Sequence, residues 1–251
     1  MVYLIYGILK GPPLPGTYGD LTGVRGKPVI FIEAHALCAA VSAMELEEVA
    51  PPVVELLAYA QVVETIHRRQ TVVPMRYGCF LNGLPGVLDV LKERQLQYET
   101  LLAELDGHVE MGIRIFLQRK EDEKIPAEGT TLLNEKSATN GRAYLALRKV
   151  HYLMQEETSQ DRQALIDRYL QEFSGLYARH STETETKNGA VILSFYFLIP
   201  KSAVNRFRET FGDMMAMGND EARLSGPWPP YNFVTDYIGK LGDTISKPLS
   251  S

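Results

Sequence analysis

The sequence predicts an α+β fold of two domains, each a ferredoxin-like sandwich with an antiparallel sheet, the second elaborated with extra helices. In both halves of the chain, short apolar β-rich runs alternate with segments whose apolar residues recur at helical spacing. A charged, polar stretch separates the halves. We therefore expect an N-terminal α+β domain over residues 1–118, a linker over 119–136, a C-terminal domain over 137–236 and a tail over 237–251.

The first half opens with strands. Residues Val2 to Leu9 form a continuous apolar run, which is typical of a central strand buried on both faces. A loop rich in glycine and proline follows over Gly11–Gly26. Two further apolar runs, Pro28–Ala34 and Leu37–Ala43, are joined by a very short connection, which predicts a hairpin.

A helix, a strand, a second helix and a final strand complete this half. The segment Pro52–Arg69 predicts a helix because its apolar side is regularly spaced. The residues of that stripe are Val53, Leu56, Leu57, Ala60, Val63 and His67. After the strand Thr71–Met75 and a turn at Asn82–Gly86, one long helix is expected to end at Asp106-Gly107, before the strand His108–Gln118. We expect these helices to cover one face of the sheet.

The second half repeats the alternation of helix and strand. Helical spacing predicts helices over Gly141–Met154 and Asp161–Tyr177. Residues 178–187 alternate threonine and glutamate in their second part, which fits either an exposed strand or a solvated loop. The strongest strand of the chain is Val191–Ile199, and an amphipathic helix that carries Phe207 follows it.

Composition excludes several classes of function. The chain has 251 residues, of which 45% are hydrophobic and 23% charged, and its net charge is −5. Nucleic-acid binding is not expected, because no concentrated basic surface is encoded. No apolar run approaches the length of a membrane span, and the N-terminus lacks the features of a signal peptide. Cys38 and Cys79 lie in apolar contexts and are expected to be reduced core thiols of a cytosolic protein.

The search for chemistry gives no catalytic, metal or cofactor site. Phosphate-binding loops, dinucleotide fingerprints and nucleophile elbows are absent from the sequence. Glu64 with His67, and His108 with Glu110, have spacings that suit metal ligands. Each pair supplies only two ligands where roughly three or four are needed, so surface or hydrogen-bonded histidines are the simpler interpretation.

One motif above background is the segment Thr71–Phe80, which places Pro74, Arg76 and Tyr77 at the end of an apolar strand. An arginine among apolar residues must reach water or find a partner. The sequence leaves two interpretations of Arg76 open, a structural ion pair and a recognition residue at a domain surface.

The second motif is Gly226–Phe233, where three prolines alternate with large aromatic side chains. Such a segment is stiff and extended. It suits either a strap across the second sheet, anchored by Trp228, or an interaction surface. The candidate partner-binding residues of the two motifs are Arg76, Tyr77, Trp228, Tyr231 and Phe233.

Together these features resemble the gas vesicle protein GvpF/GvpL family. The likeness spans about Tyr3 to Val234, and the two motifs just described are specific in combination. The matching segments are Tyr3–Ile8, Gly23–Gly26, Leu37–Ser42, Val72–Gly78, Gly141–Leu145 and Gly226–Phe233. Compactness and length favour an F-type member over an L-type member.

The resemblance implies an accessory protein of gas vesicle assembly, located in the cytoplasm and at the vesicle. Such a protein is expected to bind the small hydrophobic GvpA-type wall subunit, to help nucleate or incorporate it, and to associate with other accessory proteins. It implies no catalytic residue and no cofactor. Two alternatives stay open: a scaffold that links accessory proteins without binding the wall subunit, and a small-molecule enzyme on a ferredoxin-like fold.

Overall fold

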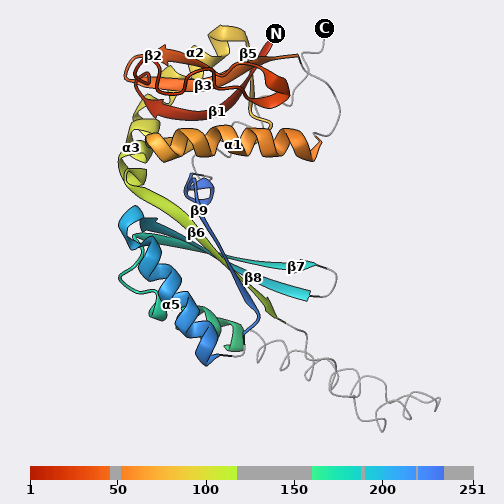
Figure 1. Ribbon diagram of the computed structural model, residues 1–251, viewed down its shortest axis with the longest axis vertical. Coiled ribbons are helices and arrows are strands. Elements are labelled where there is room, and N and C mark those ends of the chain that lie inside the picture. Colours follow the sequence, from red (N-terminus) through yellow and green to blue (C-terminus); the bar gives the residue numbers. More distant parts are fainter. Residues whose placement is uncertain (46–51, 118–159, 188–189, 219, 235–251) are drawn as a thin grey trace, which may run out of the picture.

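The computed structural model describes residues 1–45, 52–117, 160–187, 190–218 and 220–234. The α+β class with antiparallel sheets is confirmed, since two such sheets lie one above the other, each with its own helices (Figure 1). The predicted linker, the first predicted helix of the second half and the tail lie outside the described residues.

The first sheet is built around β1 (Val2–Lys10). On one side β1 pairs with β3 (Leu37–Met44), which pairs in turn with β2 (Ile30–Ala34) through the predicted hairpin. On the other side β1 pairs with β4 (Val72–Pro74) along one half and with β5 (Phe80–Asn82) along the other. Every residue of β1 before its last is buried, which confirms the predicted central strand.

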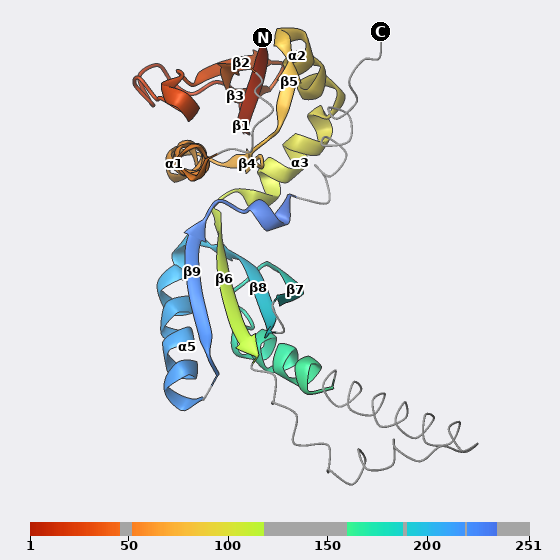
Figure 2. The same ribbon diagram turned by 90° about the vertical axis from the view of Figure 1, so that its right-hand side faces the viewer.

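Helices cover both faces of this sheet (Figure 2). The side chain of Tyr6 packs with the apolar residues of α1 (Val53–Arg69). The side chain of Ile5 points the other way and packs with those of α2 (Gly83–Glu93) and α3 (Gln95–Leu105). The expectation that helices cover one face is therefore wrong, because a strand that is apolar on both sides needs a cover on each.

The single long helix expected after β5 is interrupted. α2 already begins at Gly83, within the predicted turn, and ends at Glu93. Arg94 has φ −114° and ψ 19°, which lies outside the helical region and separates α2 from α3. Two short helices rather than one therefore cover this face of the sheet.

α1 buries a different stripe from the one that its spacing predicted. The predicted residues in its N-terminal half are exposed, among them Val53 and Leu57. Tyr59 is buried instead, with its hydroxyl 2.8 Å from the carbonyl oxygens of Ile5 and Met75. Two overlapping stripes fit helical spacing in this helix, and the hydrogen bonds of Tyr59 to the sheet decide which one turns inward.

The second sheet has the strand order β7–β8–β6–β9. Its two central strands are β6 (His108–Leu117) and β8 (Ala190–Pro200), and all neighbours are antiparallel. The edges are β7 (Arg179–Lys187), which settles the threonine and glutamate segment as an exposed strand, and β9 (Ala222–Trp228). In chain order the unit is strand, helix, strand, strand, helix, strand, the ferredoxin-like arrangement.

One face of the second sheet carries both helices of this unit (Figure 1). Residues 160–172 are helical, and α5 spans Val204–Met217. Phe173 and Phe207 stack at 4.2 Å between ring centroids, and Phe197 of β8 packs against both. This aromatic cluster forms the core of the unit.

β6 was expected to close the first sheet, and that expectation is wrong. β6 pairs with β8 and β9 in the second sheet. The chain therefore crosses between the sheets near Gly107, about ten residues before the boundary predicted at residue 118. The apolar side chains of β6 suit either sheet, so local pattern alone does not assign it.

Candidate functional site at the joint between the two units

The two motifs that the sequence singled out meet where the units touch. This contact, called the joint below, is made by α1, the loop after β4 and residues 229–234. At its centre lies Glu110 of β6, which is 4% exposed. The backbone N–H of Asn232 donates to Glu110 Oε2 at 2.9 Å, and its side-chain amide donates to Oε1 at 2.6 Å. Asn232 follows Tyr231 in the short 3-10 turn η5 (Tyr231–Phe233), so the second motif is anchored on this carboxyl group.

Charge also places the first motif at the joint. Burial raises the pKa of Glu110 to about 7, while the hydrogen bonds of Asn232 and the positive charge of Arg76 act to lower it. Arg76 is itself exposed. Its guanidinium therefore contributes to the electrostatic balance of a buried carboxyl group and still reaches water, so it combines features of both interpretations that the sequence left open.

Tyr77 is tied to the first unit. Its hydroxyl donates to Glu55 Oε2 at 2.8 Å, and the Nε of Arg25 donates to Oε1 of the same carboxylate at 2.7 Å. These two donors hold the pKa of Glu55 below its usual value. The ring of Tyr77 also meets that of Tyr59 edge to face, at 5.3 Å between centroids. Tyr77 therefore positions the loop that carries Arg76.

The side chains of η5 extend into both cores of the first unit. Tyr231 is half-buried against the cluster under α1, and Phe233 is buried in the cluster under α2 and α3. The guanidinium of Arg179 lies 5.6 Å from the ring centroid of Phe233 and forms an ion pair of 3.0 Å with Glu104. Phe233 therefore stabilises the joint from within rather than presenting a surface.

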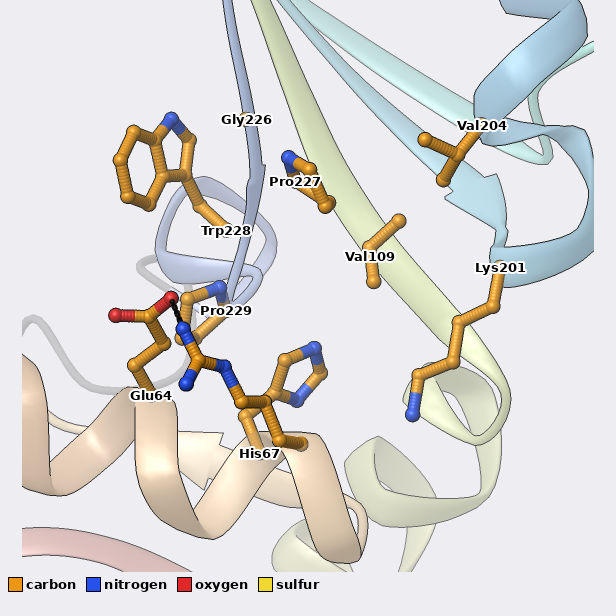
Figure 3. Close-up of a pocket in the computed structure, with 10 residues that line it drawn as sticks. Glu64, His67, Val109, Lys201, Val204, Gly226, Pro227, Trp228 and Pro229 are labelled. Atoms are coloured by element: carbon orange, nitrogen blue, oxygen red, sulfur yellow. Dashed lines mark hydrogen bonds and ion pairs between the residues drawn. The ribbon is translucent and has the colours of Figure 1, made fainter.

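Trp228 is the exposed aromatic residue of the second motif, with 46% of its surface exposed. It lines a cavity of about 570 Å³ between α1 and the end of β9 (Figure 3). Trp228 and Pro227 project to opposite sides of the end of β9, and Pro227 lies on the same side as Val109 (Figure 3). The proline and aromatic segment is thus both a strap over the joint and one wall of a cavity.

The opposite wall of this cavity is polar. His67 of α1 is 6% exposed, yet both of its ring nitrogens lack a hydrogen-bond partner among the described residues. Burial, with a further contribution from the charge of Lys201, lowers the pKa of His67 to about 4. Lys201 begins the 3-10 turn η4 (Lys201–Ala203), and its side chain extends toward α1 (Figure 3).

The glutamate and histidine pairs that the sequence offered do not come together. Glu64 forms an ion pair with Arg68 at 2.6 Å rather than with His67. The Nδ1 of His108 lies 2.7 Å from the carbonyl oxygen of Asp106, while the carboxylate of Glu110 is held by Asn232. Within the described ranges, no group of three or more histidine, cysteine or acidic side chains is placed to hold a metal ion.

Two further expectations concern the cysteines and the membrane. Cys38 is buried and Cys79 half-buried, and both are free thiols. Burial raises the pKa of Cys38 to about 12 and that of Cys79 to about 11. Of the helices in the described segments, none is long and apolar enough to cross a membrane.

The sequence missed two partnerships of this site. Glu110 and Asn232 are 122 positions apart, and nothing near either residue signals the other. His67 and Lys201 likewise come from different units and meet only across the joint. The available signal was Glu110 next to the apolar residues Val109 and Met111 of β6, since a buried carboxyl group requires partners.

Comparison with known proteins gives one consistent family. A sequence model of the family described as "Gas vesicle synthesis protein GvpL/GvpF" matches residues 2–235. Gas vesicle protein F of a Streptomyces species is 28% identical over 246 residues, which covers 92% of this chain and 98% of that protein. Gas vesicle protein F1 of Halobacterium salinarum is 23% identical over 239 residues, 93% of each chain.

Solved structures support the fold over the same span. The crystal structure of GvpF from Microcystis aeruginosa has a TM-score of 0.75 at 18% identity and covers 92% of this chain and 98% of that one. That of GvpF from an Anabaena species has a TM-score of 0.74 at 17% identity, with 92% and 95% coverage. At these identities the likeness concerns the fold alone.

Proposed function

This chain belongs to the GvpL/GvpF family of gas vesicle synthesis proteins, and we propose that within gas vesicle assembly it binds the small hydrophobic GvpA-type wall subunit before that subunit is incorporated. The family supports a role in gas vesicle assembly and interaction with other gas vesicle proteins. Residence in the cytoplasm and at the vesicle is part of the proposal. The bound state keeps an aggregation-prone wall subunit soluble until it joins the wall.

The observation that carries the proposal is the outward face of α1. Its N-terminal half exposes Val53, Val54, Leu56 and Leu57, with Leu57 65% exposed. Single exposed apolar residues are ordinary, but four within five positions of one helix form a contiguous apolar surface. A wall subunit that is apolar over much of its own surface is the kind of partner that such a face fits.

Helix geometry extends this surface toward the second motif. Leu57 and Glu64 are seven positions apart, about two helical turns, so they lie on the same face of α1. Glu64 lines the cavity that Trp228 also lines. Of the five candidate residues, Trp228 and Arg76 are the exposed ones, so they remain candidates for direct contact. Tyr77 positions the loop that carries Arg76, and Tyr231 and Phe233 hold the joint.

The experiment is co-expression of the protein with a GvpA-type wall subunit, followed by affinity capture and measurement of soluble wall subunit. Leu57→Glu introduces a charge into the exposed face of α1, and we expect at least a tenfold loss of captured subunit. Leu96→Glu is the matched control, because Leu96 is 77% exposed on α3 in the same unit. Trp228→Ala tests the second candidate region with a smaller expected loss.

Equal capture by the Leu57→Glu and Leu96→Glu variants, both folded by circular dichroism, would contradict the proposed α1 surface. Capture of other accessory proteins without the wall subunit would favour the scaffold alternative. The absence of enzymatic activity remains a prediction. If the protein turned over a small molecule and lost that activity on His67→Gln, the enzyme alternative would replace this prediction.

A further inference from the structure

The cavity beside Trp228 has an asymmetry that the proposed function does not use. His67 lines it from a buried position on α1, whereas Pro227 and Trp228 line it from exposed positions at the end of β9 (Figure 3). A buried imidazole without a hydrogen-bond partner is costly, because the ring loses water and gains nothing in exchange. Both ring nitrogens of His67 are in this state among the described residues. A ligand group with an acceptor oxygen would satisfy the N–H of His67 from within the cavity.

The charges around the cavity indicate whether that ligand group is positively or negatively charged. Three charged side chains line it, and two of them form the Glu64–Arg68 ion pair. The third is Lys201, for which no salt bridge occurs in the described segments. The lining therefore carries one unmatched positive charge, located where its field reaches His67. A single anionic group is the natural complement.

The other residues that line the cavity indicate what the rest of the ligand is, beyond its anionic group. Val109, Val204, Pro227 and Pro229 supply aliphatic walls, and Trp228 supplies a broad aromatic face. Proline and valine surfaces offer contact area without hydrogen bonds, so they favour an apolar body. The volume of about 570 Å³ falls within the range of small-molecule sites.

We propose that this cavity binds a carboxylate that carries an apolar body, with the carboxylate between Lys201 and His67 and the body against Val109, Pro229 and Trp228. This inference rests on the cavity and is independent of wall-subunit binding. Two sources share the chemistry: a free aliphatic acid, and the C-terminal carboxylate of a protein chain that ends in an apolar residue.

Trp228 makes the proposal directly measurable, because it is the single tryptophan of the chain and it lines the cavity. The probe is 4-methylpentanoate, which does not absorb where tryptophan does. Its neutral amide, 4-methylpentanamide, is the matched ligand. We expect a saturable change in Trp228 emission with the acid, and at least tenfold weaker binding of the amide.

Two variants test the polar end of the site. Lys201→Gln removes the unmatched charge from an exposed side chain and should weaken the acid at least tenfold while leaving the amide unchanged. Lys92→Gln, on an exposed position of α2, is the control and should bind as the unmodified protein does. His67→Gln keeps a donor in the cavity and should weaken the acid less than Lys201→Gln.

No saturable emission change, equal affinity for acid and amide, or acid binding that survives Lys201→Gln would each overturn the proposal. A second titration distinguishes a free acid from a chain terminus as the source of the carboxylate. It compares the peptide acetyl-Gly-Val-Leu with the same peptide carrying a C-terminal amide. Peptide affinity at least tenfold above that of 4-methylpentanoate, and lost on amidation, identifies a chain terminus as the ligand. Tighter binding of the free acid identifies a small molecule.

Discussion

The two units of this protein bury their sheets in different ways. The first sheet has helices on both faces, whereas the second carries its helices on one face (Figure 2). On the other face of the second sheet, Arg114 is exposed and Phe116 is half-buried, with the Arg223 guanidinium 5.0 Å from its ring centroid. β1 is apolar on both sides and has a cover on each, whereas β6 carries Glu110 and Arg114 on one side and is covered by helices on the other. β8 is nearly as apolar as β1 and still lies in the sheet with helices on one face, so the number of layers depends on the whole sheet rather than on one strand.

The largest expected effect tests whether the one-sided unit depends on its aromatic core. Phe197→Ala removes a buried ring that packs against Phe173 and Phe207. We expect a loss of about 3–5 kcal/mol in the free energy of unfolding, because the ring leaves a cavity that its neighbours fill only partly. Denaturant titration measures the loss, and hydrogen exchange should show β8 opening before β1. If hydrogen exchange became faster by the same factor in β8 and in β1, the two units would unfold as one.

A second test uses the carboxyl group that joins the units. The pKa of Glu110 is about 7 in the folded protein and 4.5 for a glutamate exposed to water, so this group favours the folded protein most below pH 4.5. That contribution is lost as pH rises through 7, on the order of 3 kcal/mol at 1.36 kcal/mol for each pKa unit. We expect Glu110→Gln to lose less stability than the unmodified protein between pH 5 and pH 8, as measured by denaturant titration. Parallel stability curves over this range would show that Glu110 is already ionised.

The third test cuts the joint from the opposite side. Asn232→Ala removes the side-chain amide that donates to Glu110 at 2.6 Å, and we expect a loss of about 1–3 kcal/mol from the unsatisfied buried group. The two units should then melt in separate calorimetric transitions. Asn205→Ala, at an exposed position of α5, is the control and should leave the calorimetric trace unchanged. A single transition in the Asn232→Ala variant would place the coupling elsewhere.

The smallest effect is expected at the surface. Glu64→Gln removes an ion pair four positions apart on α1, in which the Arg68 side chain is 71% exposed. Such pairs contribute about 0.3–0.5 kcal/mol, so the midpoint of thermal unfolding should hardly move. A loss as large as that of Asn232→Ala would show that Glu64 supports the joint as well as α1.

The local elements were largely predictable from the sequence. The apolar run of β1 predicted a buried strand, and the short connection at His35 predicted the hairpin of β2 and β3. His35 has φ 58°, a tight-turn conformation that suits this link. These features depend on neighbouring residues, so a single sequence contains them.

What sequence reasoning missed depends on partners far along the chain. The buried side of α1 is chosen by Tyr59, whose hydroxyl meets carbonyl oxygens of two strands. The sheet that receives β6 is chosen by pairing with β8, beyond the predicted linker. The candidate site depends on distant partners in the same way, because Glu110 and Asn232 come together only when the strands of the second sheet are paired.

The way in which the chain crosses between the units has a mechanical consequence. It leaves the first unit near Gly107 and returns to it through Tyr231 and Phe233, so the second unit is attached at both of its ends. A body held at one point can turn in every direction, but a body held at two points keeps a single axis of rotation, the line that joins them. The Arg179–Glu104 ion pair and the packing of Leu198 in the core under α2 and α3 link the units at further places. A rotation about that line therefore has to break these contacts first.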